Sequence, residues 1–398
     1  MPGNGVIRRV LPDEMPRFTS IHVQAWNMDP GSFNPDEAEL EDSRVLAVEG
    51  DLVAVLFLLR RDTWMGPDRV PQVGLGGVAT PAEHRRRGYC RALLGGVLEE
   101  ARASGDALSL LWPFSHAFYR KLGWEVGGRA LEVTLPLASL PGRSSGWSAC
   151  PVDPDSEAHL AELDAVYSRS VQEYNGCLVR EPRDWKRKLS RKHERRFAYL
   201  LRRPGGGAAA YAVYAFKDLD HFHRRMDVRE LLALDGEAHK ALLGFLRDHD
   251  SQAREIQFYL PEQHPLLYSW PDRPQVTYRD AFMLRVVDVK RALEGLTYPG
   301  EGEMALNWRV EDPLCPWNHG TFRVTWSGPR CTLERLDGSP QADLACDIAT
   351  LSGIYAGHLP AGAARVLGRL RLDGDEGARL SWLRRAFGRR PGHLLDFF

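Results

Sequence analysis

The stretch that decides the fold runs from residue 77 to residue 94 and reads Gly77-Val78-Ala79-Thr80-Pro81-Ala82-Glu83-His84-Arg85-Arg86-Arg87-Gly88-Tyr89-Cys90-Arg91-Ala92-Leu93-Leu94. The pattern predicts a strand over 73–80, then a turn rich in Arg and Gly, then an amphipathic helix over 88–103. The start of a helix leaves about four backbone N–H groups without partners and carries partial positive charge. Such a turn is therefore suited to hold a pyrophosphate. Gly88 lets the backbone approach the phosphates, and the small Cys90 leaves them room.

A second informative stretch lies about thirty residues downstream and reads Phe118-Tyr119-Arg120-Lys121-Leu122-Gly123-Trp124-Glu125. It follows a predicted strand over 107–112 and covers a predicted short helix over 116–122. The G-K-[ST] of a P-loop and the G-x-G-x-x-G of a Rossmann fold are both missing from the sequence. These absences exclude the two commonest nucleotide-binding motifs and leave the Arg/Gly turn as the candidate phosphate site.

Together the two stretches resemble motifs A and B of the GCN5-related N-acetyltransferases, the GNAT superfamily. Motif A, usually written Q/R-x-x-G-x-G/A, is matched by Arg85-x-x-Gly88-x-Cys90, with Cys in place of Gly or Ala. Motif B, F-Y-x-K-x-G-[FWY]-x, is matched by residues 118–125. The resemblance implies that acetyl-CoA is the co-substrate. The residues that it implies for holding acetyl-CoA are Val78, Ala79, Thr80, Arg86, Arg87, Gly88, Tyr89, Cys90, Arg91, Phe114 and Ser115.

Length and composition place the chain among ordinary soluble globular proteins. It has 398 residues, 43% of them hydrophobic and 26% charged, which is enough for two or three domains with cores of their own. The formal net charge of −1 gives no general basic field, so we expect neither nucleic acid nor an anionic membrane as a partner. The longest apolar run, residues 52–59, is far shorter than the ~20 residues that span a bilayer.

Cysteine usage and the start of the sequence indicate a cytoplasmic protein. The six cysteines are scattered without a C-x-x-C pair, and the first fifteen residues lack the apolar core of a signal peptide. We therefore expect reduced thiols rather than a disulfide scaffold. The sequence contains no H-E-x-x-H and no other paired metal-ligand spacing, so no metal site is expected.

Composition separates three segments along the chain. A Pro/Gly/Ser-rich stretch over 136–154 is typical of a linker, and the domains are predicted at 1–147, 148–288 and 289–398. In the first domain, strands are predicted at 6–10, 43–49, 52–60, 73–80, 107–112 and 124–135, and helices at 12–26, 88–103 and 116–122.

The second segment repeats the order of strands and helices of the first without repeating its residues, which indicates a degenerate structural duplication. Asp235-Gly236-Glu237 stands at a helix start where the first segment has Arg-Arg-Arg-Gly. Two carboxylates at a helix start repel a pyrophosphate, so we expect only the first domain to bind CoA. In the third segment, short strands at 304–311, 321–326 and 330–336 lead to helices near 347–357 and 377–387, which indicates a small α+β domain.

An intact GNAT domain, a GNAT-like domain without the motifs and a small α+β domain together resemble the Eis family of acetyltransferases. The resemblance covers nearly the whole chain and includes residues 84–88, 177–185, 284–289 and the terminal Phe398. It implies an α+β fold class, with tandem GNAT folds (active N-terminal, degenerate central) followed by a sterol-carrier-protein-like domain. It also implies a symmetric homo-oligomer, a hexamer.

The Eis resemblance implies roles for two residues. Tyr119 is the expected general acid that protonates the leaving thiolate, and the terminal carboxylate of Phe398 is the expected general base. From the residues alone, Tyr119 is equally a buried aromatic with a hydrogen-bonded hydroxyl. Alternative carboxylates for the base are Asp396, Glu125 and Asp29. Side chains that either line the amine pocket or belong to the core are Trp26, Trp64, Met65 and Phe114.

The sequence leaves two functions open. The first is an acetyl-CoA-dependent N-acetyltransferase that acts in a ternary complex on a primary amine, such as an aminoglycoside, a polyamine or a lysine side chain. The second is a non-catalytic acyl-CoA or lipid-binding protein whose third domain holds an apolar ligand. Release of free thiol from acetyl-CoA when amines are added distinguishes the enzyme from the binding protein.

Overall fold

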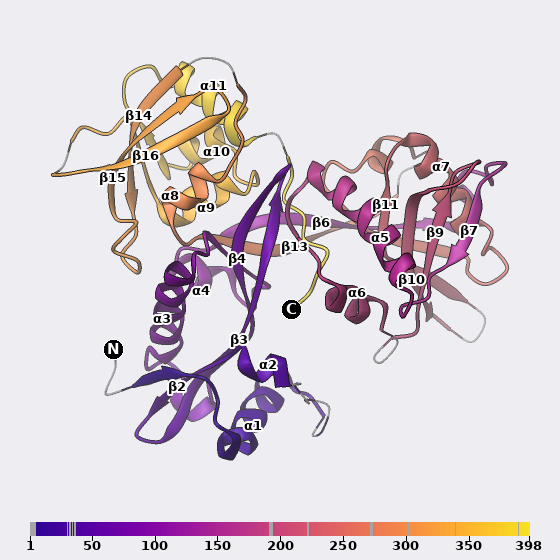
Figure 1. Cartoon of the computed structure of the whole chain (residues 1–398), viewed down its shortest axis with the longest axis horizontal. Helices are drawn as coiled ribbons and strands as arrows, with labels where there is room; N and C mark the ends of the chain where they lie inside the picture. The colour runs from indigo at the N-terminus through magenta and orange to yellow at the C-terminus, as the bar shows by residue number, and fades with distance from the viewer. Residues whose placement is uncertain are drawn as a thin grey trace. The chain divides into compact units, whose positions relative to one another are not determined.

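The computed structural model describes residues 5–29, 31, 33, 35, 37–190, 194–220, 223–270, 274–300, 303–338, 340–388 and 390–398. The chain divides into two compact units. The first unit consists of residues 1–127, 282–389 and 396–398, and the second of residues 128–281 and 390–395. The first unit therefore contains both the indigo start and the yellow end of the chain in Figure 1.

The predicted phosphate-binding turn follows one strand of the amino-terminal sheet of the first unit. The strand order of this sheet is β1-β2-β3-β4-β5-β13. Neighbouring strands are antiparallel except β4 and β5, which are parallel because helix α3 connects them. The strands are β1 (Val6–Arg8), β2 (Ser43–Val48), β3 (Asp51–Met65), β4 (Asp68–Ala79), β5 (Leu108–Leu111) and β13 (Gln275–Val286), of which residues 283–286 pair with β5.

Helix α3 (Tyr89–Ser104) buries one apolar face in this unit, as its sequence period predicts. Its five buried residues each contribute about 1.5–3 kcal/mol when removed from water, apart from the smaller alanine. They are Leu93, Leu94, Val97, Leu98 and Ala101. The other helices of this part are α1 (Met15–Trp26), α2 (Glu37–Glu41) and α4 (His116–Arg120).

Strand β4 contains a bulge close to its carboxyl end. Phe57 of β3 pairs with Gly76 and Val55 pairs with Ala79, so one extra residue is inserted in β4 between these pairs. Gly77 within the bulge has φ +59°, a value that glycine adopts without strain. The parallel pairing of β4 with β5 ends just before it, at Leu75. The end of β4 is therefore bent immediately before the turn that leads to α3.

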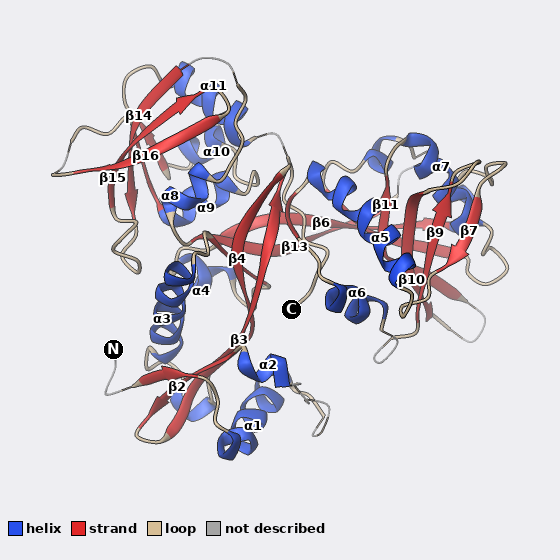
Figure 2. Ribbon diagram, viewed as in Figure 1, coloured by secondary structure: helices blue, strands red, loops and turns tan. Residues whose placement is uncertain are grey.

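The remainder of the first unit is a five-stranded sheet in the order β16-β15-β14-β17-β18, in which β14 and β17 are parallel. Helices α8 to α11 gather on one side of it (Figure 2). The strands are β14 (Glu303–Glu311), β15 (Gly320–Ser327), β16 (Arg330–Leu336), β17 (Leu344–Asp347) and β18 (Leu370–Leu372). The helices are α8 (Val289–Glu294), α9 (Ile348–Tyr355), α10 (Ala361–Val366) and α11 (Glu376–Phe387).

The second unit repeats the central arrangement of the amino-terminal sheet. Its strand order is β6-β12-β11-β10-β9-β7, and β11 and β12 are parallel neighbours connected through helix α7, as β4 and β5 are through α3. This confirms the predicted duplication. The strands are β6 (Glu125–Pro136, of which residues 128–136 belong to this unit), β7 (Ser148–Pro151), β8 (Asn175–Leu178), β9 (Arg196–Arg202), β10 (Ala208–Asp218), β11 (Arg224–Ala233) and β12 (Glu255–Pro261). The helices are α5 (Glu157–Ser170), α6 (Pro182–Leu189) and α7 (Gly236–Arg247).

The structure corrects one sequence-based expectation about the elements and adds one strand that was not expected. The predicted linker over 136–154 contains strand β7, which pairs with β9, because a short edge strand tolerates Pro151 at its end. The strand β13 was not predicted, although it crosses from one unit to the other. Its alternating pattern is interrupted by the charged residues Arg279 and Asp280, and this hides it from a periodicity argument.

Candidate active site

The start of α3 forms the predicted amide-lined turn. The first bond inside the helix runs from the Ala92 N–H to the Gly88 carbonyl at 3.0 Å, so the N–H groups of residues 88–91 precede the helical ladder. Gly88 caps the helix with φ +82°, and no side chain caps it. Arg86 also has a left-handed backbone, with φ +61°, a strained conformation for a residue with a Cβ. Four arginine side chains around this turn are exposed, Arg85, Arg86, Arg87 and Arg91.

Ion pairs fix the segment that leads into the turn. His84 Nε2 lies 2.8 Å from an Asp51 carboxylate oxygen at the start of β3. Arg17 of α1 donates to Asp51 at 3.2 Å and to Glu83 at 2.5 Å. Burial acts to raise the pKa of Asp51, but His84 and Arg17 outweigh it and leave the pKa below its ordinary value. The approach to the turn is therefore connected to both α1 and β3.

Cys90 lies in the first turn of α3 as a neutral thiol. Burial raises the pKa of the Cys90 thiol to about 12, although a hydrogen bond with Thr80 acts in the opposite direction. Thr80 itself follows directly after Val78 and Ala79, which are both buried at the end of β4. A thiol with so high a pKa stays protonated at neutral pH and is a poor nucleophile.

Tyr119 is a buried residue of α4, and only 1% of its surface is exposed. Its ring centroid lies 5.1 Å from those of Phe114 and Phe118. Ser115 caps α4 by accepting a hydrogen bond from the Phe118 N–H at 3.3 Å. Burial, and to a smaller extent the nearby Cys90, raise the pKa of Tyr119 well above its ordinary value. The phenol therefore keeps its proton at any physiological pH.

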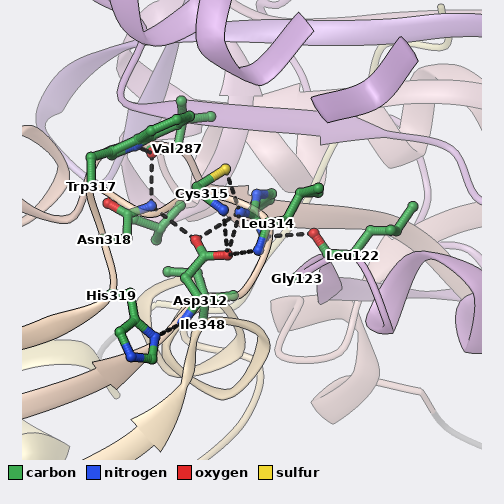
Figure 3. Close-up of polar contacts among 12 residues, drawn as sticks. Leu122, Gly123, Val287, Asp312, Leu314, Cys315, Trp317, Asn318, His319 and Ile348 are labelled. Atoms are coloured by element: carbon green, nitrogen blue, oxygen red, sulfur yellow. Dashed lines mark hydrogen bonds and ion pairs between the residues drawn. The ribbon is translucent and has the colours of Figure 1, made fainter. Parts of the chain in front are cut away.

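A buried arginine lies beneath the loop that follows α4. Arg285, at the end of β13, donates to the Leu122 carbonyl at 2.5 Å and to the Asp312 carboxylate at 2.7 Å. Figure 3 shows the carboxylate of Asp312 at the centre of several dashed contacts, and another dashed line that reaches the Leu122 carbonyl. Gly123 has φ +94°, and a Cβ on it would lie 1.5 Å from an Arg285 nitrogen. The glycine of motif B is therefore required by a side chain 162 positions later in the sequence.

The last residues of the chain lie against β4. A Cβ on Gly74 would lie 2.5 Å from the Phe398 ring, and a Cβ on Gly76 would lie 3.0 Å from the Phe398 carboxyl carbon. Trp112, directly after β5, donates its indole N–H to the Asp396 carbonyl at 3.0 Å. Phe398 thus occupies the space that two glycines leave immediately before the bulge of β4.

The alternative carboxylates differ in their surroundings. Glu125 is buried and accepts hydrogen bonds from Arg120 at 2.8 Å and Arg369 at 2.6 Å. Burial raises the pKa of Glu125, but these arginines and the Val126 N–H hold it below its ordinary value. Its oxygens are committed to structural partners and are unsuited to take a proton from an amine. Asp29 is exposed, and Asp396 is half-buried.

The side chains considered for the amine pocket separate into core and surface. Trp64 and Met65 are each only 4% exposed and belong to the core. Trp26 and Phe114 are 47% and 59% exposed. Among the described residues, His, Cys, Asp and Glu side chains form no group of three suited to hold a metal ion. In the same part of the chain, every helix is too short or too polar to cross a membrane.

The corresponding helix start in the second unit carries a carboxylate. Asp235 caps α7 by accepting a hydrogen bond from the Ala238 N–H at 3.0 Å. That hydrogen bond, together with one from Arg203, lowers the pKa of Asp235. A carboxylate of the chain itself therefore already occupies the start of α7, where a phosphate would bind.

Comparison with known proteins gives matches along nearly the whole chain. Acetyltransferase (GNAT) domain families match residues 6–127 and 176–286, and a sterol carrier protein domain family matches residues 289–394. An uncharacterized N-acetyltransferase of Streptomyces avermitilis is 29% identical over 78% of this chain and 78% of its own length. The N-acetyltransferase Eis of Mycobacterium tuberculosis is 28% identical over 79% of this chain and 78% of its own length.

Solved structures share the fold. A GCN5-related N-acetyltransferase from Anabaena variabilis superposes with a TM-score of 0.89 at 22% identity, covering 99% of this chain and all of that one. Eis1 from Mycobacterium abscessus superposes with a TM-score of 0.80 at 22% identity and the same coverage.

The fold and these matches define the class of protein: the chain is an N-acetyltransferase built from two GNAT domains and a sterol-carrier-protein-like domain. Within that class it is Eis-like, as the motifs predicted, because it resembles the Eis acetyltransferases along most of its length. The comparisons therefore favour the enzyme over a non-catalytic binding protein.

Proposed function

We propose that this enzyme transfers the acetyl group of acetyl-CoA directly to a primary amine. The observation that carries the proposal is the grouping of three features around the end of β4. The start of α3, which no side chain caps, follows that strand, Tyr119 lies near Cys90 of α3, and Phe398 lies against Gly74 and Gly76. An anion site, a buried phenol and a carboxylate are the groups that acetyl transfer needs.

Acetyl-CoA fits the turn between Thr80 and Leu93. The N–H groups of residues 88–91 precede the helical ladder and suit a pyrophosphate, and a Cβ on Gly88 would meet no atom within 4 Å. The exposed Arg86, Arg87 and Arg91 add positive charge, and the bent edge at Val78–Thr80 suits the pantetheine arm. Tyr89, Phe114 and Ser115 complete this proposed binding surface. When bound, acetyl-CoA supplies the thioester, and backbone N–H groups near Val78 polarise its carbonyl.

Tyr119 is the proposed acid and Phe398 the proposed base. The amine nitrogen attacks the thioester carbonyl carbon, the C–S bond breaks, and the leaving sulfur takes the Tyr119 proton. Burial raises the pKa of Tyr119, so the phenol carries its proton before the step. Because a thiol has a lower reference pKa than a phenol, near ~8.5 against ~10, the proton transfer is uphill and must be concerted with C–S cleavage. The Phe398 carboxylate takes the proton of the amine. Since an α-carboxyl has a reference pKa near ~3.5 and an alkyl ammonium near ~10, a water relay or desolvation of the carboxylate must assist.

The neutral Cys90 thiol supports direct transfer. A covalent acetyl-enzyme needs a thiolate, and burial raises the pKa of Cys90 to about 12. Direct attack in a ternary complex needs no such nucleophile.

For the acceptor we propose an aminoglycoside-like compound, a polyamine or a lysine side chain. For the assembly we propose a cytoplasmic homo-oligomer, a hexamer. Light scattering combined with size-exclusion chromatography measures the mass of the assembly and so tests the hexamer.

The first experiment follows free thiol released from acetyl-CoA with kanamycin, spermidine or a lysine-containing peptide. Turnover with at least one amine, and a large fall in that turnover in Tyr119→Phe to a residual rate that can still be measured, supports the proposal. Tyr355→Phe is a matched control, because Tyr355 is another buried tyrosine of the first unit and donates its hydroxyl to a backbone carbonyl, Ala292, at 3.0 Å. No thiol release with any amine, or full turnover in Tyr119→Phe, would contradict the proposed chemistry.

A second experiment tests the carboxylate of Phe398. One glycine added after Phe398 moves the carboxylate away from Gly76, so turnover should fall at least tenfold while acetyl-CoA binding is unchanged. Phe398→Leu is the control, because it keeps a terminal carboxylate on residue 398 and replaces only the ring that packs against Gly74. Unchanged turnover in the extended chain would dismiss Phe398 as the base.

A further inference from the structure

The loop that follows Tyr119 is held by residues from the distant part of the first unit. The Leu122 carbonyl accepts from Arg285 at 2.5 Å, and the Glu125 carboxylate accepts from Arg369 at 2.6 Å. The Ser352 hydroxyl of α9 lies 3.3 Å from the Gly123 carbonyl, and it also donates to its own helix at Ile348. Residues 122–125 are therefore contacted three times by residues that follow position 282.

Arg285 is itself fixed by Asp312. Their side chains are 0% and 1% exposed, and Asp312 accepts from one Arg285 nitrogen with both oxygens, at 3.0 and 2.7 Å. Asp312 also accepts from the N–H of Cys315 and from the side chain of Asn318, which Figure 3 shows around the carboxylate. The Arg285 Nε has no hydrogen-bond partner among the described residues, but both Asp312 oxygens accept from several donors, so the carboxylate and the guanidinium nitrogen bonded to it have one well-defined geometry.

The loop held in this way is bonded to Tyr119. The N–H groups of Leu122 and Trp124 both donate to the Tyr119 carbonyl, at 2.9 and 3.2 Å. Gly123 lies between them and has no room for a side chain, because Arg285 occupies that space. A displacement of the loop is therefore transmitted to the backbone of Tyr119 through two hydrogen bonds.

We infer that Asp312, acting through Arg285, and Arg369, acting through Glu125, are positioning residues for Tyr119. This inference rests on the acid role proposed for Tyr119. It gives the sterol-carrier-protein-like part a catalytic task that does not involve a lipid: it sets the place of the phenol relative to the leaving sulfur. A misplacement of about 1 Å at a reacting group can cost about a hundredfold in rate, so small shifts are measurable.

The experiment compares Arg369→Gln and Asp312→Asn with Asp343→Asn in the full-length chain. Asp343 forms an ion pair with Arg379 at 2.5 Å in the same part of the unit without contacting residues 122–125, so it is the control. With the best amine of the panel, we expect the first two variants to lower kcat about tenfold to a hundredfold and leave the acetyl-CoA dissociation constant unchanged. Asp343→Asn should keep kcat, and Arg369→Lys, which retains the cation, should recover part of it.

A double-mutant cycle separates positioning from general damage. In the Tyr119→Phe background, Arg369→Gln should lower kcat no further, because the group that it positions is gone. The 19F resonance of 3-fluorotyrosine at position 119 should shift in Arg369→Gln and stay in Asp343→Asn. An unshifted resonance, or an equal loss of kcat in both backgrounds, overturns the inference. Full activity of Tyr119→Phe overturns the acid role instead. If Asp312→Asn does not fold, Arg369→Gln decides.

Discussion

At the residue scale, substitution of the two glycines at opposite ends of α3 distinguishes the effect of backbone strain from the effect on ligand binding. Gly88 and Gly105 both have left-handed backbones, with φ +82° and +96°, and a Cβ on either would meet no atom within 4 Å. Replacing either by Ala should therefore cost about 1–2 kcal/mol of folding free energy, and for the same conformational reason.

Acetyl-CoA affinity should distinguish the two substitutions. In Gly88→Ala the new methyl group stands where we propose that the backbone meets the pyrophosphate, so the dissociation constant should rise at least tenfold. In Gly105→Ala it should stay unchanged. Isothermal titration calorimetry and urea unfolding of both variants measure the two effects. Equal affinities would remove the pyrophosphate from the start of α3.

The role of a single residue could be predicted from the sequence where the conformation of the neighbouring backbone determines that role. The Arg85-x-x-Gly88-x-Cys90 pattern predicts the helix start, because the residue that caps the helix has a left-handed backbone and Gly88 supplies it. Arg285 carries no such local signal. Its partners Leu122 and Asp312 lie 163 and 27 positions away, and only the folded chain brings them together.

At the element scale, the junction between α4 and β6 should respond to acid through Glu125. Burial raises the pKa of Glu125, but Arg120, the Val126 N–H and Arg369 lower it more, so the net pKa is below its ordinary value of 4.5. A carboxyl with a lowered pKa stabilises the folded state above its unfolded pKa and loses that contribution as pH falls through the folded value.

Glu125→Gln should therefore destabilise the enzyme at pH 7 by roughly 2–3 kcal/mol. The difference from the parent chain should shrink as pH falls below about 4.5, because the parent then loses its own ion pairs. Urea unfolding at several pH values measures it. The exposed Glu99→Gln is the control and should follow the parent throughout. A difference that is the same at pH 7 and pH 3.5 would contradict this account.

Helices and strands could be predicted where apolar residues recur at a regular spacing, and not where one strand is shared by two units. The buried face of α3 follows from its sequence. Strand β13 does not, because residues 275–281 belong to one unit and residues 282–286 to the other, so no single alternation describes it. The short strand β8 is invisible for a different reason. Its residues Asn175–Leu178 are all buried and show no polar and apolar alternation.

At the scale of the whole molecule, the chain carries two GNAT folds, and we expect one acetyl-CoA per chain. The start of α3 is open, whereas the start of α7 is capped by Asp235. Calorimetric titration should give a stoichiometry of one. Gly88→Ala should weaken that single event and reveal no second one. A stoichiometry of two would show that the second unit also binds acetyl-CoA.

The division of the chain also affects how it is made. Strand β5 pairs with residues 283–286, but the ribosome must first add residues 128–281, which belong to the other unit. At about 5–20 residues per second, this takes roughly 8 to 30 seconds. During that time the Leu108–Leu111 edge has no neighbour on one side, and the apolar strand is open to pairing with other nascent chains. Slower synthesis or warmer growth should therefore reduce the soluble yield of this enzyme before its folded state becomes unstable.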